Sequence, residues 1–214
     1  MLTALYQFRT KCCGNDDVWQ YYLKTRIFRC QFCGTETDFA ALPSEILPPV
    51  RDAHTPVFVG MSPIRVAFIP SDSNRGFLNF KVGDELHCGV VDTRGQVRSY
   101  SPKERRFRCE GSGMWKQSIV CEFPEMGDVD GIHWDKMIME EIQREPHHPE
   151  FDCLDFAVNV LNRTAGGDAY TRENLSEKMG CQLYHVLKFA KIQRRIMQQQ
   201  LPINPDEINL YPNI

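Results

Sequence analysis

Residues 85–101 read ELHCGVVDTRGQVRSYS, and this stretch decides how the middle of the chain folds. Apolar residues, several of them β-branched, recur on both sides of the four residues DTRG. Gly95 ends that group and suits the positive φ that a tight turn requires. Two strand-like runs joined by such a turn predict a β-hairpin, with strands at residues 84–91 and 96–100.

One histidine lies in the first strand of this hairpin. Because successive side chains on a strand point to opposite faces, His87 shares a face with Gly89 and Val91, while Cys88 points the other way. The hairpin alone leaves two interpretations of His87 open. It is either an ordinary residue of the sheet or one half of a catalytic pair whose cysteine lies elsewhere.

The segments around the hairpin predict an α+β fold with an antiparallel sheet and packed helices. Short runs rich in Val, Ile and Phe predict further strands, and after residue 130 the apolar spacing becomes helical. The predicted strands are residues 57–61, 64–70 and 115–123, and the predicted helices are residues 133–145 and 151–162, a helix starting at Thr171, and a long helix at residues 183–198.

Composition divides the chain into three parts. Residues 1–45 are rich in cysteine, residues 46–200 hold the predicted α+β core, and residues 201–214 form an extended, proline-containing tail. A proline-rich connection, residues 42–55, joins the first part to the second. No internal repeat or low-complexity segment interrupts this layout.

Bulk properties narrow the functional classes. A net charge of −3 and a pI near 6.1 give no electrostatic footprint for nucleic acid, so no nucleic-acid partner is predicted. The first residues contain no signal-peptide pattern, and no run reaches the roughly 18 apolar residues of a transmembrane span. We therefore expect a soluble intracellular protein, cytoplasmic or alternatively nuclear. An odd count of nine cysteines does not fit a complete disulfide framework.

The first candidate for chemistry is a metal site in the N-terminal part. Cys30 and Cys33 form a C-x-x-C pair followed by Gly34, the spacing with which a zinc knuckle places two thiolates on one ion. Cys12 and Cys13 are the nearby cysteines that could complete a structural zinc site, although adjacent side chains diverge. A plain turn with buried thiols explains the same residues.

The second candidate pairs Cys153 with His87. Cys153 lies near the start of a predicted helix, where unpaired N–H groups and the helix dipole favour a thiolate. An imidazole beside it would act as base and then as acid, and backbone N–H groups at the same helix end could stabilise an oxyanion. The competing interpretation is a buried cysteine and a histidine of the core.

Other residues have weaker claims. His147 and His148 could join Cys153 as metal ligands, but Pro149 and the helix start make that geometry awkward, so an exposed loop is the simpler prediction. The amphipathic helix at residues 183–200 is expected to dock on the core rather than on a partner or a membrane. Four further cysteines are predicted to serve packing: Cys88, Cys109, Cys121 and Cys181.

Several of these motifs occur together in one known family. The ordered series HCGVVDTRGQVRSY, HWDK, FDCLDFAVNVLN and LYHVLKFAKIQRRI, preceded by QFRTKCCG and FRCQFCG, resembles the makorin opposite-strand protein family. The resemblance covers roughly residues 5–197. This resemblance implies a shared fold but no particular function, because no activity is associated with it.

A looser resemblance bears on chemistry. A strand histidine followed by Gly-Val, a hairpin, and a cysteine at a helix start with Phe156 three residues later is similar to circularly permuted papain-like proteins. These include the lecithin–retinol acyltransferase-like, PPPDE and NlpC-type enzymes. The resemblance implies a permuted papain-like core with Cys153 as nucleophile and His87 as base. Asp152 replaces the asparagine that often precedes the nucleophile, and Ser99 or Asp92 are the only suggestions for a third, orienting group.

These observations give two functional hypotheses. The first is a cysteine-dependent hydrolase or acyltransferase that cleaves a thioester, ester or isopeptide, with a protein or acyl compound as substrate. The second is a non-catalytic protein-interaction module that retains the papain-like fold. The distance between Cys153 and His87 distinguishes them at the level of geometry.

Overall fold

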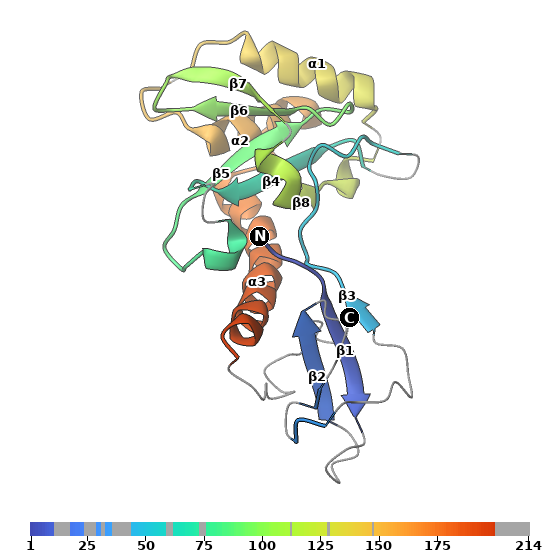
Figure 1. Cartoon of the computed structure of the whole chain (residues 1–214). Coiled ribbons are helices and arrows are strands. Elements are labelled where there is room, and N and C mark those ends of the chain that lie inside the picture. The colour runs from blue at the N-terminus through green and yellow to red at the C-terminus, as the bar shows by residue number, and fades with distance from the viewer. Residues whose placement is uncertain are drawn as a thin grey trace. The chain divides into compact units, whose positions relative to one another are not determined.

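The computed structural model describes residues 1–10, 18–23, 29–30, 33–35, 44–58, 62–72, 76–111, 113–127, 129–146 and 148–199, with the backbone alone for 8–10 and 18–19. Two compact units divide the chain. One contains Met1–Pro49, Phe77–Asn79 and the chain from Tyr184 on, and the other contains Val50–Gly76 and Phe80–Leu183. Each unit has its own antiparallel sheet, so the architecture is α+β (Figure 1).

The larger unit is built on five antiparallel strands in the order β7-β6-β5-β4-β8. The predicted hairpin is present as its centre, with Gly95 at a φ of 80°. The predicted strand at residues 64–70 is also present, and every residue of it within β4 is buried. The strands are β4 (Arg65–Pro70), β5 (Leu86–Val91), β6 (Val97–Ser101), β7 (Arg106–Glu110) and β8 (Ile119–Glu122).

Strands β5 and β6 separate soon after their turn. They pair at Val91 with Val97 and at Val90 with Arg98, and the fully described hairpin has no further pair. Beyond that point β6 continues its pairing with β7 as far as Ser101. The edge of β5 at His87 and Cys88 is therefore not covered by β6, although its other edge stays paired with β4.

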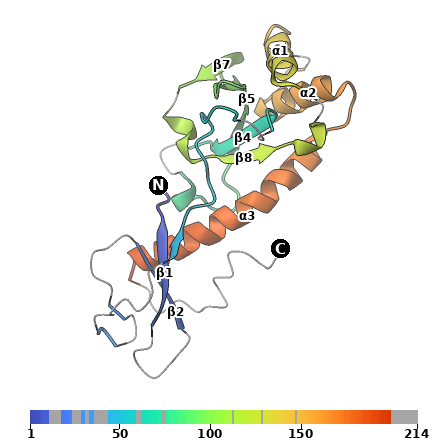
Figure 2. The same ribbon diagram turned by 90° about the vertical axis from the view of Figure 1, so that its right-hand side faces the viewer.

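Two helices cover this sheet. Helix α2 (Cys153–Ala165) packs against β5 and β6, and helix α1 (Gly131–Ile142) packs against α2 (Figures 1 and 2). Both agree with the predicted helices within a few residues. α2 is amphipathic, with Phe156, Ala157, Val160 and Leu161 buried. It ends at Gly166, whose φ of 74° is the left-handed conformation that a helix C-terminus favours.

The HWDK segment fastens α1 to the hairpin. The indole N–H of Trp134 donates to the carbonyl oxygen of Val91 at 2.8 Å. Asp135 accepts hydrogen bonds from the backbone N–H and the hydroxyl of Thr93, at 2.9 and 2.6 Å. Residues 133–136 therefore fix the turn end of the hairpin relative to the helices.

Three predictions about elements were wrong. The helices expected from Thr171 and at residues 183–198 are one continuous helix, α3 (Arg172–Met197). The strand expected at residues 115–123 begins only at Ile119, because a 3-10 turn at Met114–Gln117 is closed by the hydroxyl of Ser118 on the carbonyl of Trp115. Residues 57 and 58 are not in a strand, and residues 59–61 lie outside the described residues.

The smaller unit contains a sheet that the sequence did not predict. Its three antiparallel strands are β1 (Leu5–Thr10), β2 (Val18–Leu23) and β3 (Ser44–Ile46), in the order β2-β1-β3. Gln193 of α3 joins the chain start within this unit, since it accepts from the N–H of Thr3 and donates to the carbonyl of Met1. Among the residues that the structure describes, no helix is long and apolar enough to cross a lipid bilayer.

Candidate active site

Helix α2 begins with an acidic cap that defines the position of Cys153. Asp152 is the N-cap residue and accepts hydrogen bonds from the N–H groups of Leu154 and Asp155, at 2.8 and 3.0 Å. Asp155 returns a bond to the N–H of Asp152, which completes a capping box. Cys153 is thus the first helical residue, and its own N–H has no acceptor among the described residues.

Aromatic residues anchor this helix start to the sheet. The ring of Phe151, which is 3% exposed, lies 4.9 Å from the ring of Tyr100 on β6 in an edge-to-face contact. Phe156, one turn into the helix, lies 5.0 Å from Phe107 on β7. The rings therefore hold the first turn of α2 near the point where β6 leaves β5.

Cys153 lies at the uncovered edge of β5. The side chains of His87 and Cys88 and the backbone N–H of Cys88 lie close enough to its sulfur to interact with it. His87 and Cys88 belong to opposite faces of the strand, so a sulfur at the strand edge is a position that both can reach. The structure thus brings Cys153 and His87 together, and both are half-buried.

These contacts stabilise a thiolate at Cys153. The interaction with the side chain of Cys88 is the strongest influence and lowers the pKa of Cys153. Burial opposes it, the side chain and charge of His87 act in the same direction as Cys88, and the pKa is held at about 5. The interaction with Cys153, together with burial, raises the pKa of Cys88. Cys88 is 2% exposed and Cys153 begins a helix, so Cys153 carries the negative charge.

The carboxylate next to Cys153 is neutralised by an arginine at the start of α3. Arg172 donates two hydrogen bonds to Asp152, at 3.0 and 2.8 Å, and another to Asp155. Burial raises the pKa of Asp152, but the bonds from Arg172 and from the backbone of Asp155 outweigh it and lower that pKa. A carboxylate beside a thiolate raises the pKa of the thiol, and the positive charge of Arg172 offsets this effect of Asp152.

The imidazole of His87 packs on a buried indole. Its ring centroid lies 5.8 Å from that of Trp115, which is fully buried. The two polar residues suggested from sequence as orienting groups have other partners. The hydroxyl of Ser99 donates to Glu110, and Asp92 accepts from the N–H groups of Arg94 and Gln96 in the hairpin turn.

The N-terminal zinc candidates are only partly described. Cys12 and Cys13 lie outside the described residues. Cys30 is buried and accepts a hydrogen bond from Gln20 at 3.4 Å, whereas Cys33 is exposed. Gly34 turns at a φ of 73° and its N–H donates to the carbonyl of Cys30 at 2.8 Å. Within the described ranges, no three His, Cys, Asp or Glu residues are grouped as metal ligands.

The alternative metal cluster with His147 and His148 also lies partly outside the described residues. His147 is not among the described residues, and His148 is exposed, with its ring nitrogen 3.7 Å from Asp155. The prediction that four cysteines serve packing agrees with the burial of Cys121; Cys88 is also buried, but its side chain interacts with Cys153. The prediction is wrong for Cys109 and Cys181, which are exposed.

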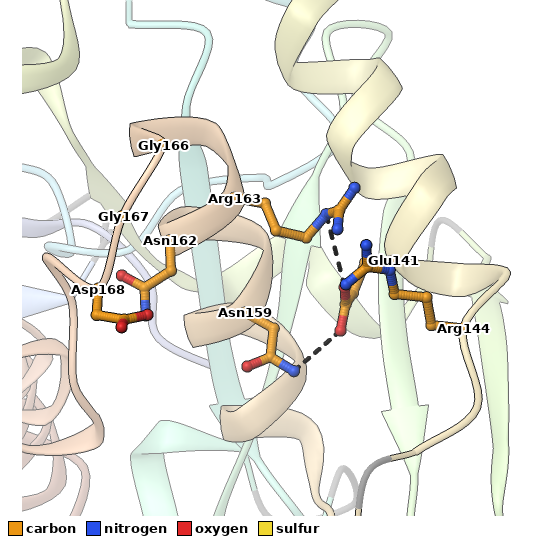
Figure 3. Close-up of a pocket in the computed structure, with 8 residues that line it drawn as sticks. All are labelled: Glu141, Arg144, Asn159, Asn162, Arg163, Gly166, Gly167 and Asp168. Atoms are coloured by element: carbon orange, nitrogen blue, oxygen red, sulfur yellow. Dashed lines mark hydrogen bonds and ion pairs between the residues drawn. The ribbon is translucent and has the colours of Figure 1, made fainter.

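Apart from the candidate site, a polar depression with a volume of about 300 Å³ lies between α1 and α2. Figure 3 shows Asn159 and Arg163 of α2 directed toward Glu141 of α1. Glu141 is 2% exposed, accepts a hydrogen bond from Asn159 at 2.9 Å and lies 3.7 Å from the Nε of Arg163. These groups bind one another and join the two helices, and no residue predicted from sequence as a site residue lines this depression.

Sequence reasoning missed two residues of the site. Cys88 was assigned to packing, although its position next to His87 gave a signal for proximity. Arg172 had no such signal, because it is 19 positions after Cys153 and reaches Asp152 only through the return of the chain into α3. Comparisons of the chain with protein-family models, with curated proteins and with solved structures find no match.

Proposed function

We propose that this protein is a cysteine-dependent hydrolase or acyltransferase that acts on a thioester, ester or isopeptide. The observation that carries the proposal is that Cys153, at the first position of a helix that packs against β5, interacts with the side chain of His87 on that strand. A thiolate is the nucleophilic form of cysteine, and a neighbouring imidazole can move the protons that acyl transfer requires. We also propose that the core has the permuted papain-like fold and that the chain belongs to the makorin opposite-strand protein family, which its sequence resembles.

The proposed reaction has two steps. The Cys153 sulfur attacks the substrate carbonyl carbon, and the imidazolium of His87 protonates the leaving thiol, alcohol or amine as the acyl bond breaks. His87 then takes a proton from water or from an acceptor nucleophile, which attacks the acyl-cysteine and releases the thiolate. The N–H of Cys153, which the helix cap leaves without an acceptor, is the proposed donor to the oxyanion.

The proposal is tested by acylation of the intact protein. The wild type, Cys153→Ala and Cys109→Ala are incubated with a p-nitrophenyl ester and with an acyl thioester, and the acylated residue is located by peptide mass spectrometry. We expect an acyl group on Cys153 in the wild type and in Cys109→Ala, whose altered thiol is exposed but outside the site. If Cys153→Ala is acylated to the same extent as the wild type, Cys153 is not the nucleophile.

A non-catalytic interaction module is the competing proposal. What favours it is that neither Ser99 nor Asp92 is available to orient His87. The variant His87→Asn separates the two proposals. A loss of acylation with an unchanged circular dichroism spectrum supports the enzyme, whereas an unacylated wild type supports the module.

A further inference from the structure

Two sulfur atoms meet at the edge of β5. Helix α2 packs against β5 so that the side chains of Cys153 and Cys88 interact where β6 does not cover the strand, and both cysteines are reduced in the structure. They differ in access: Cys153 is half-buried at the start of a helix, whereas Cys88 is 2% exposed under α2. A small reagent can therefore reach Cys153 before it can reach Cys88.

We propose that Cys153 and Cys88 form an oxidative modification site, in which a hydroperoxide oxidises Cys153 and Cys88 resolves the product as an intrachain disulfide. This inference goes beyond the proposed acyl transfer, because it needs only the thiolate and its neighbouring thiol. Its substrate class is hydrogen peroxide or a small organic hydroperoxide, which is small enough to enter a half-buried site.

The chemistry balances in two steps. The Cys153 thiolate attacks the peroxide O–O bond, takes one oxygen to become a sulfenic acid after protonation, and releases water or an alcohol. The sulfur of Cys88 then attacks the sulfenic sulfur, loses its proton, and releases water as the S–S bond forms. Sulfur is oxidised and the peroxide is reduced, and a dithiol reductant returns both cysteines to the thiol state.

Two features favour the second step over further oxidation. The side chains of Cys88 and Cys153 already interact in the reduced protein, so the resolving thiol lies beside the sulfur that it attacks. Burial of Cys88 also protects it from direct reaction with peroxide, so the order of the steps is fixed by access. A disulfide requires a sulfur–sulfur distance of about 2 Å, and β6 does not cover the edge of β5 at which the two sulfurs would approach each other.

The experiment treats the reduced full-length protein with hydrogen peroxide, blocks remaining thiols with N-ethylmaleimide, and maps peptides without reduction. We expect a linked peptide pair containing Cys88 and Cys153, and we expect dithiothreitol to restore alkylation of both residues. In Cys88→Ala we expect a dimedone-reactive sulfenic acid at Cys153 that proceeds to the sulfinic acid. Cys121→Ala, which removes another buried cysteine of the same sheet, should behave as the wild type.

The wild-type peptide map decides the matter even if a variant fails to fold. Absence of the linked pair in the peroxide-treated wild type, whether Cys153 is then unmodified or a sulfinic acid, would overturn the inference. Failure here is distinct from failure of the proposed function, since acylation of Cys153 is measured on the reduced protein. If the disulfide forms but Cys153 of the reduced protein is not acylated, this inference holds and the acyl-transfer proposal is wrong.

Discussion

Arg172 holds Asp152 with two hydrogen bonds, at 3.0 and 2.8 Å, and so balances the carboxylate that precedes the candidate nucleophile. Asp152 can therefore cap α2 without opposing the negative charge on the adjacent sulfur. The positive charge of Arg172 thus makes an acidic cap compatible with a thiolate at the next position of the chain.

Substitution of Arg172 should raise the pKa of Cys153. In Arg172→Ala the charges of Asp152 and Asp155 lose their cation, and an uncompensated carboxylate beside a thiolate disfavours it. Arg172→Lys retains the charge and serves as the matched control. Iodoacetamide alkylation of Cys153, followed by mass spectrometry as a function of pH, measures the shift, and identical profiles for Ala and Lys would contradict the prediction.

The alkylation rate of wild-type Cys153 should rise through a midpoint near pH 5 and then level off. Its folded-state pKa is about 5, so the reactive thiolate is already formed at pH values where an ordinary thiol, with a pKa of about 8.5, is protonated. In His87→Ala the midpoint should move upward by about one pH unit or more. A wild-type midpoint at the pH of an ordinary thiol would refute the stabilisation of the thiolate by its neighbours.

The cap of α2 should contribute measurably to stability. Asp152→Ala removes the acceptor for the N–H groups of Leu154 and Asp155 and should reduce the free energy of unfolding by about 1 kcal/mol. Asp152→Asn keeps a capping oxygen and should lose about half of that or less. Urea unfolding followed by circular dichroism compares the two, and equal losses would mean that the cap geometry is not the source of the effect.

The hairpin turn should not tolerate a side chain at Gly95. Its φ is 80°, and a Cβ there would lie 2.2 Å from the carbonyl oxygen of His54. We expect Gly95→Ala to reduce the free energy of unfolding by about 2 kcal/mol or more. Gly111→Ala, where a Cβ has open space, is the control and should be nearly neutral. A Gly95→Ala protein as stable as the control would contradict this packing.

Metal analysis tests the N-terminal zinc proposal. If Cys30 and Cys33 form a knuckle, the purified protein should contain close to one equivalent of zinc, and Cys30→Ser/Cys33→Ser should lose it. The turn at Gly34, with its N–H on the carbonyl of Cys30, supports this geometry. A wild-type content below about a tenth of an equivalent would dismiss the site.

Local patterns predicted the parts of the fold that depend on local interactions. The hairpin around Gly95 and the helices α1 and α2 follow from a turn residue and from apolar spacing over one segment. Helix α3 was divided in two, because Gly180 weakens the helical pattern between the predicted segments although a helix can tolerate it at about 1 kcal/mol. The N-terminal sheet was missed: its third strand pairs across a long stretch of chain, Leu5 with Ile46, and the strand pattern of the two neighbouring segments that form β1 and β2 was overlooked.

In the candidate site, too, local patterns indicated some residues, while others depend on long-range pairing. Cys153 at a helix start and His87 on a strand were proposed as candidates from residue types, and the resemblance to permuted papain-like proteins favoured their pairing. Cys88 was assigned to the opposite face, and nothing in its alternation indicated that β6 would leave β5 after Val90. Beyond that point β6 pairs with β7, a strand that was not predicted, so the sequence signal for Cys88 was only its position next to His87.

The strand order has a consequence for synthesis on the ribosome. Strand β4, near the sheet centre, pairs with β5 and also with β8, so it cannot be completed until residues 119–122 have emerged. Helix α2 follows later still, and until it docks, Cys88 and His87 lie on a nascent strand whose edge is open. The reactive thiolate is therefore a late product of assembly, and a truncated or stalled chain lacks it.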